Sequence, residues 1–302
     1  MKKIPNFIIA GGVATGTSFL SAVLAKHPEI YLPRIQRPEP NFFHYSWKYN
    51  NGIDWYLDQW FHEVKNQRAI GERSSLLLPS DFAAKRLKAS FPNIKLIFCL
   101  RNPIERTWGN YRFSVLEGLE DLSFEKALDS EAKRVSEATG RWAEVQPNAY
   151  TSRSKYSKHI KEYIELFGRN NILLIKSEDM GKAPHNHVTK VCEFLNVEPD
   201  DNLPLPPNYS SPSVLDITIQ PKLRAYFGER FPQVIEAIRK EKDLEDVIKT
   251  EDDRKMLSKL RNNLCSGKNP LPPKSRERLQ HIFAKEIKEL KKIVDFSVEN
   301  WI

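Results

Sequence analysis

The N-terminal stretch combines residue types that can bind an anion. The apolar run FIIA is typical of a buried strand, and two glycines follow it before a helical pattern opens at Ser18. A strand, a glycine-rich turn and a helix N-terminus bring backbone N–H groups together around a phosphate. The spacing Gly11-x4-Gly16-Thr17-Ser18 nearly matches the phosphate-binding pattern GxxxxGK[ST], with Thr17 in the place of the lysine.

The missing lysine decides which phosphate chemistry the loop can serve. Without it, transfer of the γ-phosphate of a nucleoside triphosphate loses its main charge clamp. The strand Lys95–Leu100 ends in Arg101 and not in the aspartate that would hold magnesium. We therefore expect the loop to bind a phosphate group without acting as an ordinary kinase or nucleoside triphosphatase.

Glu39 is a candidate base. Two prolines flank it in the segment PEPNFF and keep the backbone extended. A carboxylate between an aromatic pair and nearby cations has a setting in which its pKa can be tuned for proton abstraction. The alternative is a surface ion pair with Arg34 or Arg37.

Arg101 is a candidate anion ligand. It follows the most apolar segment of the chain, Lys95–Leu100, which is typical of a strand buried on both faces. The carboxyl end of a central parallel strand lies on the ligand-binding edge of an open α/β sheet, where a guanidinium fork suits a phosphate. A structural ion pair is the alternative role.

Composition and charge narrow the class of protein. The 302 residues are 40% hydrophobic and 28% charged, with a net charge of +8, which favours anionic ligands. Basic residues are interleaved with acidic ones, so no nucleic-acid partner is expected. Three cysteines without paired spacing predict no disulfide framework and no metal site. No signal peptide or membrane span is expected, which predicts a cytoplasmic protein.

The order of elements predicts the fold. Strands alternate with helices from residue 6 to residue 175, which favours a three-layer α/β sandwich with a mainly parallel sheet and a P-loop-like first turn. We expect one domain over residues 1–302. A proline-rich turn precedes a charged helical stretch, which predicts a helical insert over residues 212–268 near the C-terminus.

Five motifs in order resemble the PAPS-dependent sulfotransferases, in particular the branch similar to the N-sulfotransferase domain of heparan sulfate synthesis and its bacterial relatives. They are the loop GxxxxGT[ST], the segment E-x-x-F-F at Glu39, GIDWY at Gly52, GE-[KR]-S at Gly71, and LRNP-x-E-R at Leu100. A looser C-terminal pattern contains LPP and Trp301. The resemblance covers residues 5–200 well and 270–302 loosely, and the predicted insert is not covered.

The resemblance implies roles for individual residues. The loop Ala14, Thr15, Gly16, Thr17 and Ser18 would hold the 5′-phosphosulfate of PAPS (3′-phosphoadenosine 5′-phosphosulfate). Arg101 would hold its 3′-phosphate, and Glu39 would take the proton from the acceptor. The product would be PAP, and no metal is needed.

The chain departs from the family pattern at three positions. Ala14 stands where a lysine usually neutralises the leaving oxygen, Gly109 where a serine helps to bind the 3′-phosphate, and Phe113 near a frequent histidine. Three accounts stay open. Another cation (Arg37, Arg34 or Lys48) reaches the leaving oxygen, His44 shares acid–base work, or turnover is slow. A histidine beside aromatic residues is more often structural than catalytic.

These features predict an enzyme that moves a sulfuryl group from PAPS to a hydroxyl or amine of a sugar or small natural product. Five aromatic residues would suit the walls of an acceptor pocket: Phe42, Phe43, Tyr45, Trp47 and Trp108. The alternative is a non-enzymatic PAP- or PAPS-binding protein on a degenerate sulfotransferase fold. A P-loop kinase is less favoured.

Overall fold

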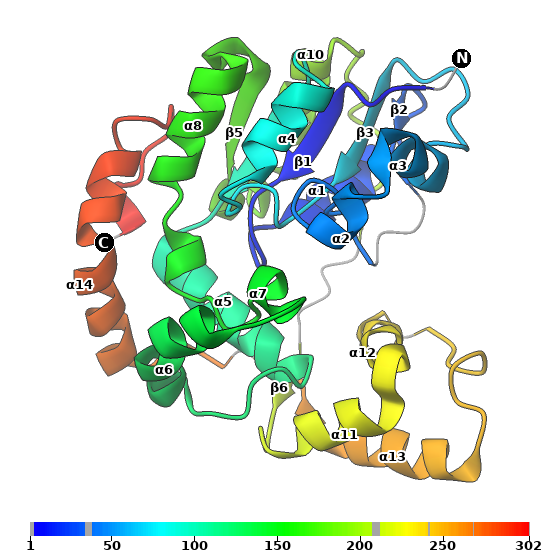
Figure 1. Cartoon of the computed structure of the whole chain (residues 1–302), viewed down its shortest axis with the longest axis vertical. Helices are drawn as coiled ribbons and strands as arrows, with labels where there is room; N and C mark the ends of the chain where they lie inside the picture. Colours follow the sequence, from blue (N-terminus) through cyan, green and yellow to red (C-terminus); the bar gives the residue numbers. More distant parts are fainter. Residues whose placement is uncertain (1–2, 34–37, 207–211, 241, 268, 302) are drawn as a thin grey trace. The chain divides into compact units, whose positions relative to one another are not determined.

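A computed structural model describes residues 3–33, 38–206, 212–240, 242–267 and 269–301 (Figure 1). The chain divides into two compact units. The first contains Met1–Arg106, Arg153–Pro206 and Gln280–Ile302, and the second contains Thr107–Ser152 and Pro207–Leu279. Helices α5 (Pro103–Leu116) and α14 (Pro273–Leu290) contribute residues to both.

The first unit contains a five-stranded sheet. Its strands are β1 (Phe7–Ala10), β2 (Ile30–Tyr31), β3 (Ala69–Arg73), β4 (Lys95–Leu100) and β5 (Ile172–Lys176). The order is β2-β3-β1-β4-β5, and each neighbouring pair is parallel. Because β1 lies between β3 and β4, the segments that follow these three strands leave the same edge of the sheet. That edge carries the Gly-rich loop, the end of GE-[KR]-S and Arg101.

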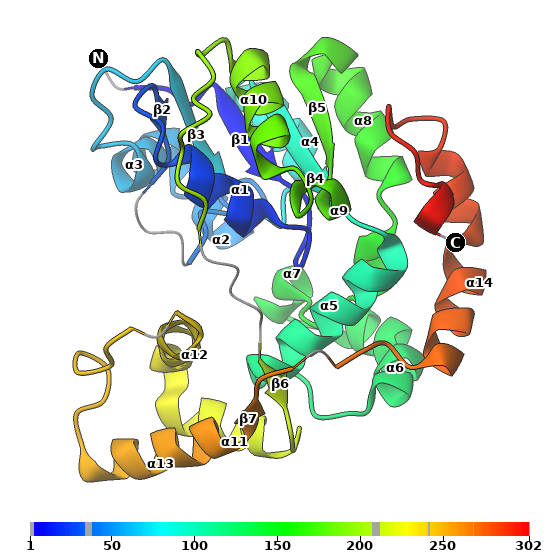
Figure 2. The same ribbon diagram turned by 180° about the vertical axis from the view of Figure 1, so that it is seen from behind.

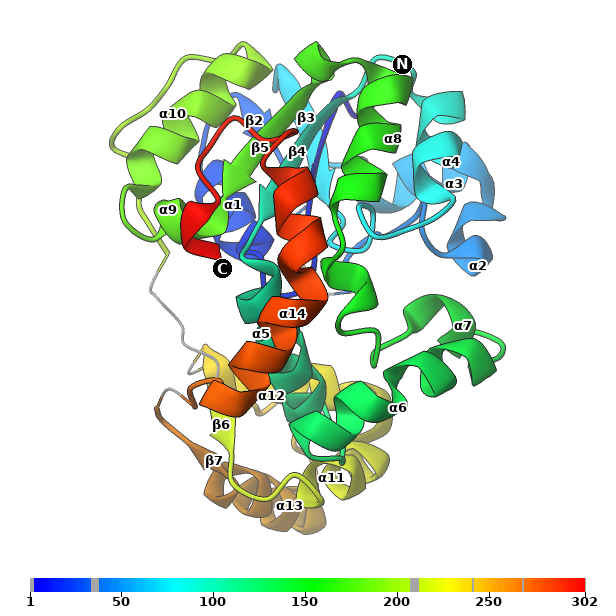
Figure 3. The same ribbon diagram turned by 90° about the vertical axis from the view of Figure 1, so that its left-hand side faces the viewer.

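Helices cover both faces of this sheet. They are α1 (Thr17–Leu24), α2 (Ser46–Tyr49), α3 (Gly52–Trp60), α4 (Ala83–Ser90), α8 (Ser157–Phe167), α9 (Ser177–Met180) and α10 (Pro184–Leu195). Helices α4 and α8 pack together on one face, and α1 and α10 pack together on the other (Figures 1 and 2). The end of α14 runs beside α8, where Glu286 accepts hydrogen bonds from the Ser157 N–H and hydroxyl at 2.7 and 2.8 Å (Figure 3).

The core explains why these segments form strands. Every residue of β1 is fully buried, and the side chains of Ile9, Ile97 and Ile175 pack with Val23 and Val191 from the helices. Strands covered on both faces read as unbroken apolar runs, as β1 and β4 do. Burying such side chains is the main favourable term in folding.

The second unit is helical and contains one short pair of strands. It contains α6 (Phe124–Glu137), α7 (Trp142–Val145), β6 (Ser213–Val214), α11 (Ile219–Phe227), α12 (Phe231–Arg239), α13 (Glu251–Asn262) and β7 (Leu264–Cys265). Strands β6 and β7 are antiparallel. The helices α11 to α13 share a core that includes Leu223, Phe231, Ile235 and Leu260. Residues 212–268, expected as an insert, all fall in this unit together with residues 107–152.

The charged stretch within the insert is divided into separate helices. Helix α13 begins at a capping box, in which the Thr250 hydroxyl accepts from the Asp253 N–H at 3.0 Å and the Asp253 carboxylate accepts from the Thr250 N–H at 3.1 Å. Such reciprocal bonds satisfy the free donors of a helix start.

The predicted α/β fold is confirmed, with a five-stranded parallel sheet flanked by helices. Across the residues described, no helix combines the length and apolar character needed to cross a membrane.

Candidate active site

The Gly-rich loop between β1 and α1 is braced from within. The fully buried Thr15 hydroxyl donates to the Gly12 carbonyl at 2.8 Å and accepts from the Gly12 N–H at 3.0 Å. A Cβ at Gly11 would lie 2.5 Å from the Cys99 carbonyl oxygen, so no larger residue fits. Gly16 has φ 86°, a left-handed conformation that favours glycine. The Thr15 side chain therefore holds the loop's conformation and is not free to bind a ligand.

The N-terminus of α1 is free of side-chain caps. Gly16 is its N-cap residue, and among the residues that the structure describes no side-chain hydrogen bond caps this end of the helix. The first N–H groups of a helix have no partner inside the helix, so those of Thr17 and Ser18 are available to a ligand. The helix dipole favours a negative group at this position. This arrangement fits the phosphate site that the sequence predicts.

Two arginines donate hydrogen bonds to backbone carbonyls of the loop. Arg101, which directly follows β4, donates to the Ala14 carbonyl at 3.0 Å. Arg106 is fully buried and donates to the Val13 carbonyl at 3.2 Å and to the Ser154 hydroxyl at 3.0 Å. The structure thus places Arg101 beside the loop, and its role as a phosphate ligand stays a prediction. Arg106, which the sequence analysis did not single out, fixes the same loop from the first turn of α5.

The Glu39 carboxylate is held by an ion pair and by a backbone hydrogen bond. Its Oε1 is 2.9 Å from Nη1 of Arg73, the last residue of β3, and its Oε2 accepts from the Ser75 N–H at 2.7 Å. The carboxylate side chain is 14% exposed, so it is neither free on the surface nor closed off from a ligand. Arg73, only 6% exposed, also donates through Nη1 to the hydroxyl of Ser18 in the first turn of α1. One guanidinium therefore links the candidate base to the anion-binding loop.

Lys48 binds the backbone of the segment that contains Glu39. Its ammonium donates to the carbonyls of Glu39 and Pro40 at 3.0 and 2.5 Å. Burial lowers the pKa of Lys48 to about 8, although the negative charges of Glu72 and Glu39 oppose the shift. The structure places this lysine against the backbone of the candidate base.

Glu72, next to Arg73 on β3, is fully buried. Burial raises the pKa of Glu72 to about 7, while the hydroxyls of Tyr56 and Ser74 and the charge of Lys48 favour its ionised form. Burial also raises the pKa of Tyr56, and the Glu72 charge adds to that shift. A second titratable carboxylate, close enough to Glu39 for their charges to interact, is therefore buried away from solvent.

The sulfotransferase domain family matches residues 5–291. The chain belongs to this family. It is similar to the membrane-associated sulfotransferase kil1 of Dictyostelium discoideum, with 32% identity over 165 residues, which are 52% of this chain and 34% of that protein.

It is also similar to the mouse bifunctional heparan sulfate N-deacetylase/N-sulfotransferase 4, with 29% identity over 66% of this chain and 23% of that protein. The chain thus spans about a third or less of the length of these two relatives. A crystal structure of a sulfotransferase from Alicyclobacillus acidocaldarius has a TM-score of 0.58 and 28% identity, and the match covers 81% of this chain and 98% of the other.

The structure sorts the remaining residues that were predicted for the sulfotransferase site. His44 is 5% exposed and stacks on the ring of Phe82 at 5.8 Å, which is the packing of a structural histidine. Arg34 and Arg37 lie outside the described residues. Gly109 lies on α5, within the second unit, and its role at the 3′-phosphate stays a prediction.

The predicted aromatic walls differ in burial. Phe42 and Phe43 are fully buried and pack on Tyr56, with ring centroids 4.6 and 5.6 Å away. They are core residues and cannot line a pocket. Tyr45 and Trp47 are half-buried and stack on each other at 4.2 Å. Trp108 is buried in the second unit.

Proposed function

We propose that this sulfotransferase moves a sulfuryl group from PAPS to a hydroxyl or amine acceptor, with Glu39 as the base. The observation that carries the proposal is the contact of Arg73 with both Glu39 and Ser18. It brings a carboxylate, a cation and the uncapped start of a helix to one edge of the sheet. Proton removal and anion stabilisation need these groups side by side.

The residues present fit the donor nucleotide. The first N–H groups of α1 are free for the phosphate next to the transferred group, and Ser18 lies beside them. We expect Arg101, which follows the interior strand β4, to bind the 3′-phosphate, since only one of its nitrogens is needed for the Ala14 carbonyl at 3.0 Å. A phosphate on the ribose 3′-oxygen distinguishes PAPS and PAP from ATP.

The reaction class follows from the site. PAPS, when bound, supplies the sulfuryl group and a phosphate leaving group. A bond forms between the acceptor oxygen or nitrogen and sulfur, the bond from sulfur to the phosphate oxygen breaks, and the acceptor proton goes to Glu39. Because Glu39 is only partly exposed and is held by Arg73 and the Ser75 N–H, its position is fixed before the acceptor arrives.

Arg73 replaces the charge that the loop lacks at Ala14. Its guanidinium is 6% exposed and lies against Ser18, so its charge acts in a region of low water content. When Glu39 takes the proton it becomes neutral, and its hold on Arg73 weakens. The positive charge of Arg73 beside the loop is then no longer compensated by Glu39, at the step in which the leaving oxygen becomes negative.

Calorimetric titration with PAP, against ATP with magnesium as the control, tests the nucleotide site. We expect PAP to bind and ATP to bind far less, and Arg101→Ala to weaken PAP binding. Release of PAP from PAPS, followed with p-nitrophenol and glucosamine as acceptors, tests the transfer. We expect Glu39→Gln to bind PAP normally and to lose turnover. Absence of PAP binding would refute the proposal, and PAP binding without turnover with any acceptor would favour a non-enzymatic nucleotide-binding protein.

A further inference from the structure

The second unit contains an open hollow beside α6 and α7. Its volume is about 320 Å³, near the lower end of the range of about 300–1,000 Å³ for small-molecule sites. Its lining includes Trp142, Arg134, Gln146 and Asn148, together with apolar atoms of Val135 and Pro147. The hollow belongs to one unit, and its residues are not among those of the candidate active site.

One wall of this hollow is the exposed indole of Trp142. All six tryptophans of the chain lie in the described residues, and Trp142 is the one that is exposed, at 52%. Large apolar side chains that remain exposed beside polar groups often mark a binding site. An indole is flat and amphipathic, so it suits a ligand with one apolar face and polar edges.

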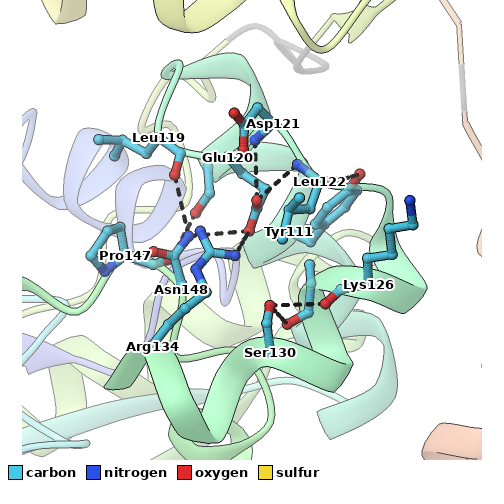
Figure 4. A network of polar contacts seen from close by, with 12 residues as sticks. Tyr111, Leu119, Glu120, Asp121, Leu122, Lys126, Ser130, Arg134, Pro147 and Asn148 are labelled. Atoms are coloured by element: carbon cyan, nitrogen blue, oxygen red, sulfur yellow. Dashed lines mark hydrogen bonds and ion pairs between the residues drawn. The ribbon is translucent and has the colours of Figure 1, made fainter. Parts of the chain in front are cut away.

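The polar side of the hollow is fixed by a buried carboxylate. Glu120 is 1% exposed, and its Oε2 accepts from Arg134 at 2.8 Å and Asn148 at 3.1 Å (Figure 4). The Tyr150 hydroxyl donates to the same oxygen at 2.6 Å. Its Oε1 accepts from the N–H groups of residues 121 and 122, both at 3.0 Å. Side chains held in this way lose little freedom when a ligand binds.

The same network sets the charge of the site. The Arg134 guanidinium is paired with Glu120, so its positive charge is largely compensated. Glu137, which also lines the hollow, adds a negative charge and is paired only loosely with Lys133 at 3.9 Å. The site therefore favours an uncharged ligand with many hydroxyl groups over an anion.

We propose that this hollow is a saccharide subsite, in which one pyranose ring stacks on Trp142 and its hydroxyls bond to Asn148 and Arg134. A pyranose has one face of C–H groups and a rim of hydroxyls, which matches an exposed indole beside fixed amide and guanidinium groups. The binding of a saccharide to Trp142 does not depend on the proposed sulfuryl transfer.

Fluorine NMR of the protein labelled with 5-fluorotryptophan tests the binding. The Trp142→Phe variant assigns the Trp142 resonance, and the labelled protein is then titrated with cellobiose and with chitobiose. We expect a saturable shift of this resonance at millimolar disaccharide. Unlabelled Trp142→Ala, monitored through backbone amides, should lose binding, whereas Tyr226→Ala, which removes another exposed aromatic of the same unit (42% exposed), should keep it.

Three results would overturn the subsite. They are no shift with either disaccharide, binding that persists in Trp142→Ala, and a shift that follows protein concentration and not disaccharide, which would show contact between copies of the chain. If PAP fails to bind while the Trp142 resonance still shifts, the subsite stands and the proposed transfer fails.

Discussion

Replacing Arg73 is the sharpest test of how the site works. Arg73→Met keeps most of the apolar volume of the side chain but removes the guanidinium that lies 2.9 Å from Glu39 and bonds to Ser18. Two effects follow. The Glu39 carboxylate loses an ionic hydrogen bond worth about 1.5–3 kcal/mol, and the reaction loses a charge contact of the kind worth ~10²–10³ in kcat.

The conservative variant separates charge from geometry. Arg73→Lys keeps a positive charge, but an ammonium on a shorter reach cannot imitate a planar fork that holds a carboxylate and a hydroxyl together. We expect kcat to fall by on the order of 10³ in Arg73→Met and by roughly 10-fold in Arg73→Lys, with PAP affinity changed less than kcat in both.

The assay is release of PAP from saturating PAPS with p-nitrophenol as acceptor, alongside calorimetric titration of each variant with PAP. Arg68→Met is the matched control, because Arg68 pairs with Glu29 at 3.3 Å in the same unit but is 63% exposed. It should leave kcat within about 2-fold of the unmodified chain, as expected for a surface pair. A folded Arg73→Met protein with unchanged kcat would refute the role of Arg73.

Two further substitutions test the electrostatics and the loop. The folded-state pKa of Glu72 lies above its ordinary value of 4.5, so the stability that this group contributes is present below pH 4.5 and is lost as pH rises through about 7. Glu72→Gln should therefore be more stable than the unmodified chain at about pH 8, by on the order of 1–3 kcal/mol, with little difference near about pH 4. Urea midpoints at both pH values check this, and equal midpoints at the higher pH would contradict it. Thr15→Val is nearly isosteric but leaves the buried Gly12 N–H without its partner and removes one of the two donors to the Gly12 carbonyl, which keeps only the Thr15 N–H at 3.3 Å. It should destabilise the protein by about 2–4 kcal/mol and weaken PAP binding; an unaltered melting temperature would show that Thr15 does not brace the loop.

The fold could be predicted from the sequence because its signals are local. The strands β1 and β4 are unbroken apolar runs, and a buried parallel sheet requires such runs. The division of the charged C-terminal stretch into three helices was not predicted. The capping box at Thr250 that starts α13 is a visible signal, but alternating charges hid the interruption before it.

The site was predicted only in part, because its charges come from segments far apart in the chain. Glu39 and the loop could be found from motifs, and the structure places Arg101 at the loop. Arg73 and Arg106 were missed because each looks like an ordinary polar residue next to a strand or helix. Their contacts to residues 55 and 93 positions away exist only in the folded chain. The GE-[KR]-S motif was the available signal for Arg73.

Placing the cation on β3 instead of on the loop has a physical consequence. A lysine at position 14 would stand on a residue with φ 69°, in a segment whose backbone must meet the ligand closely. Arg73 ends a fully buried strand that is paired with β1, so its position is set by the sheet and little freedom is lost on binding. Because the same guanidinium holds Glu39, the protonation state of the base and the charge available to the loop are coupled. A site built in this way cannot lose one group and keep the full contribution of the other, so the effects of Glu39→Gln and Arg73→Met on kcat should combine to less than their product.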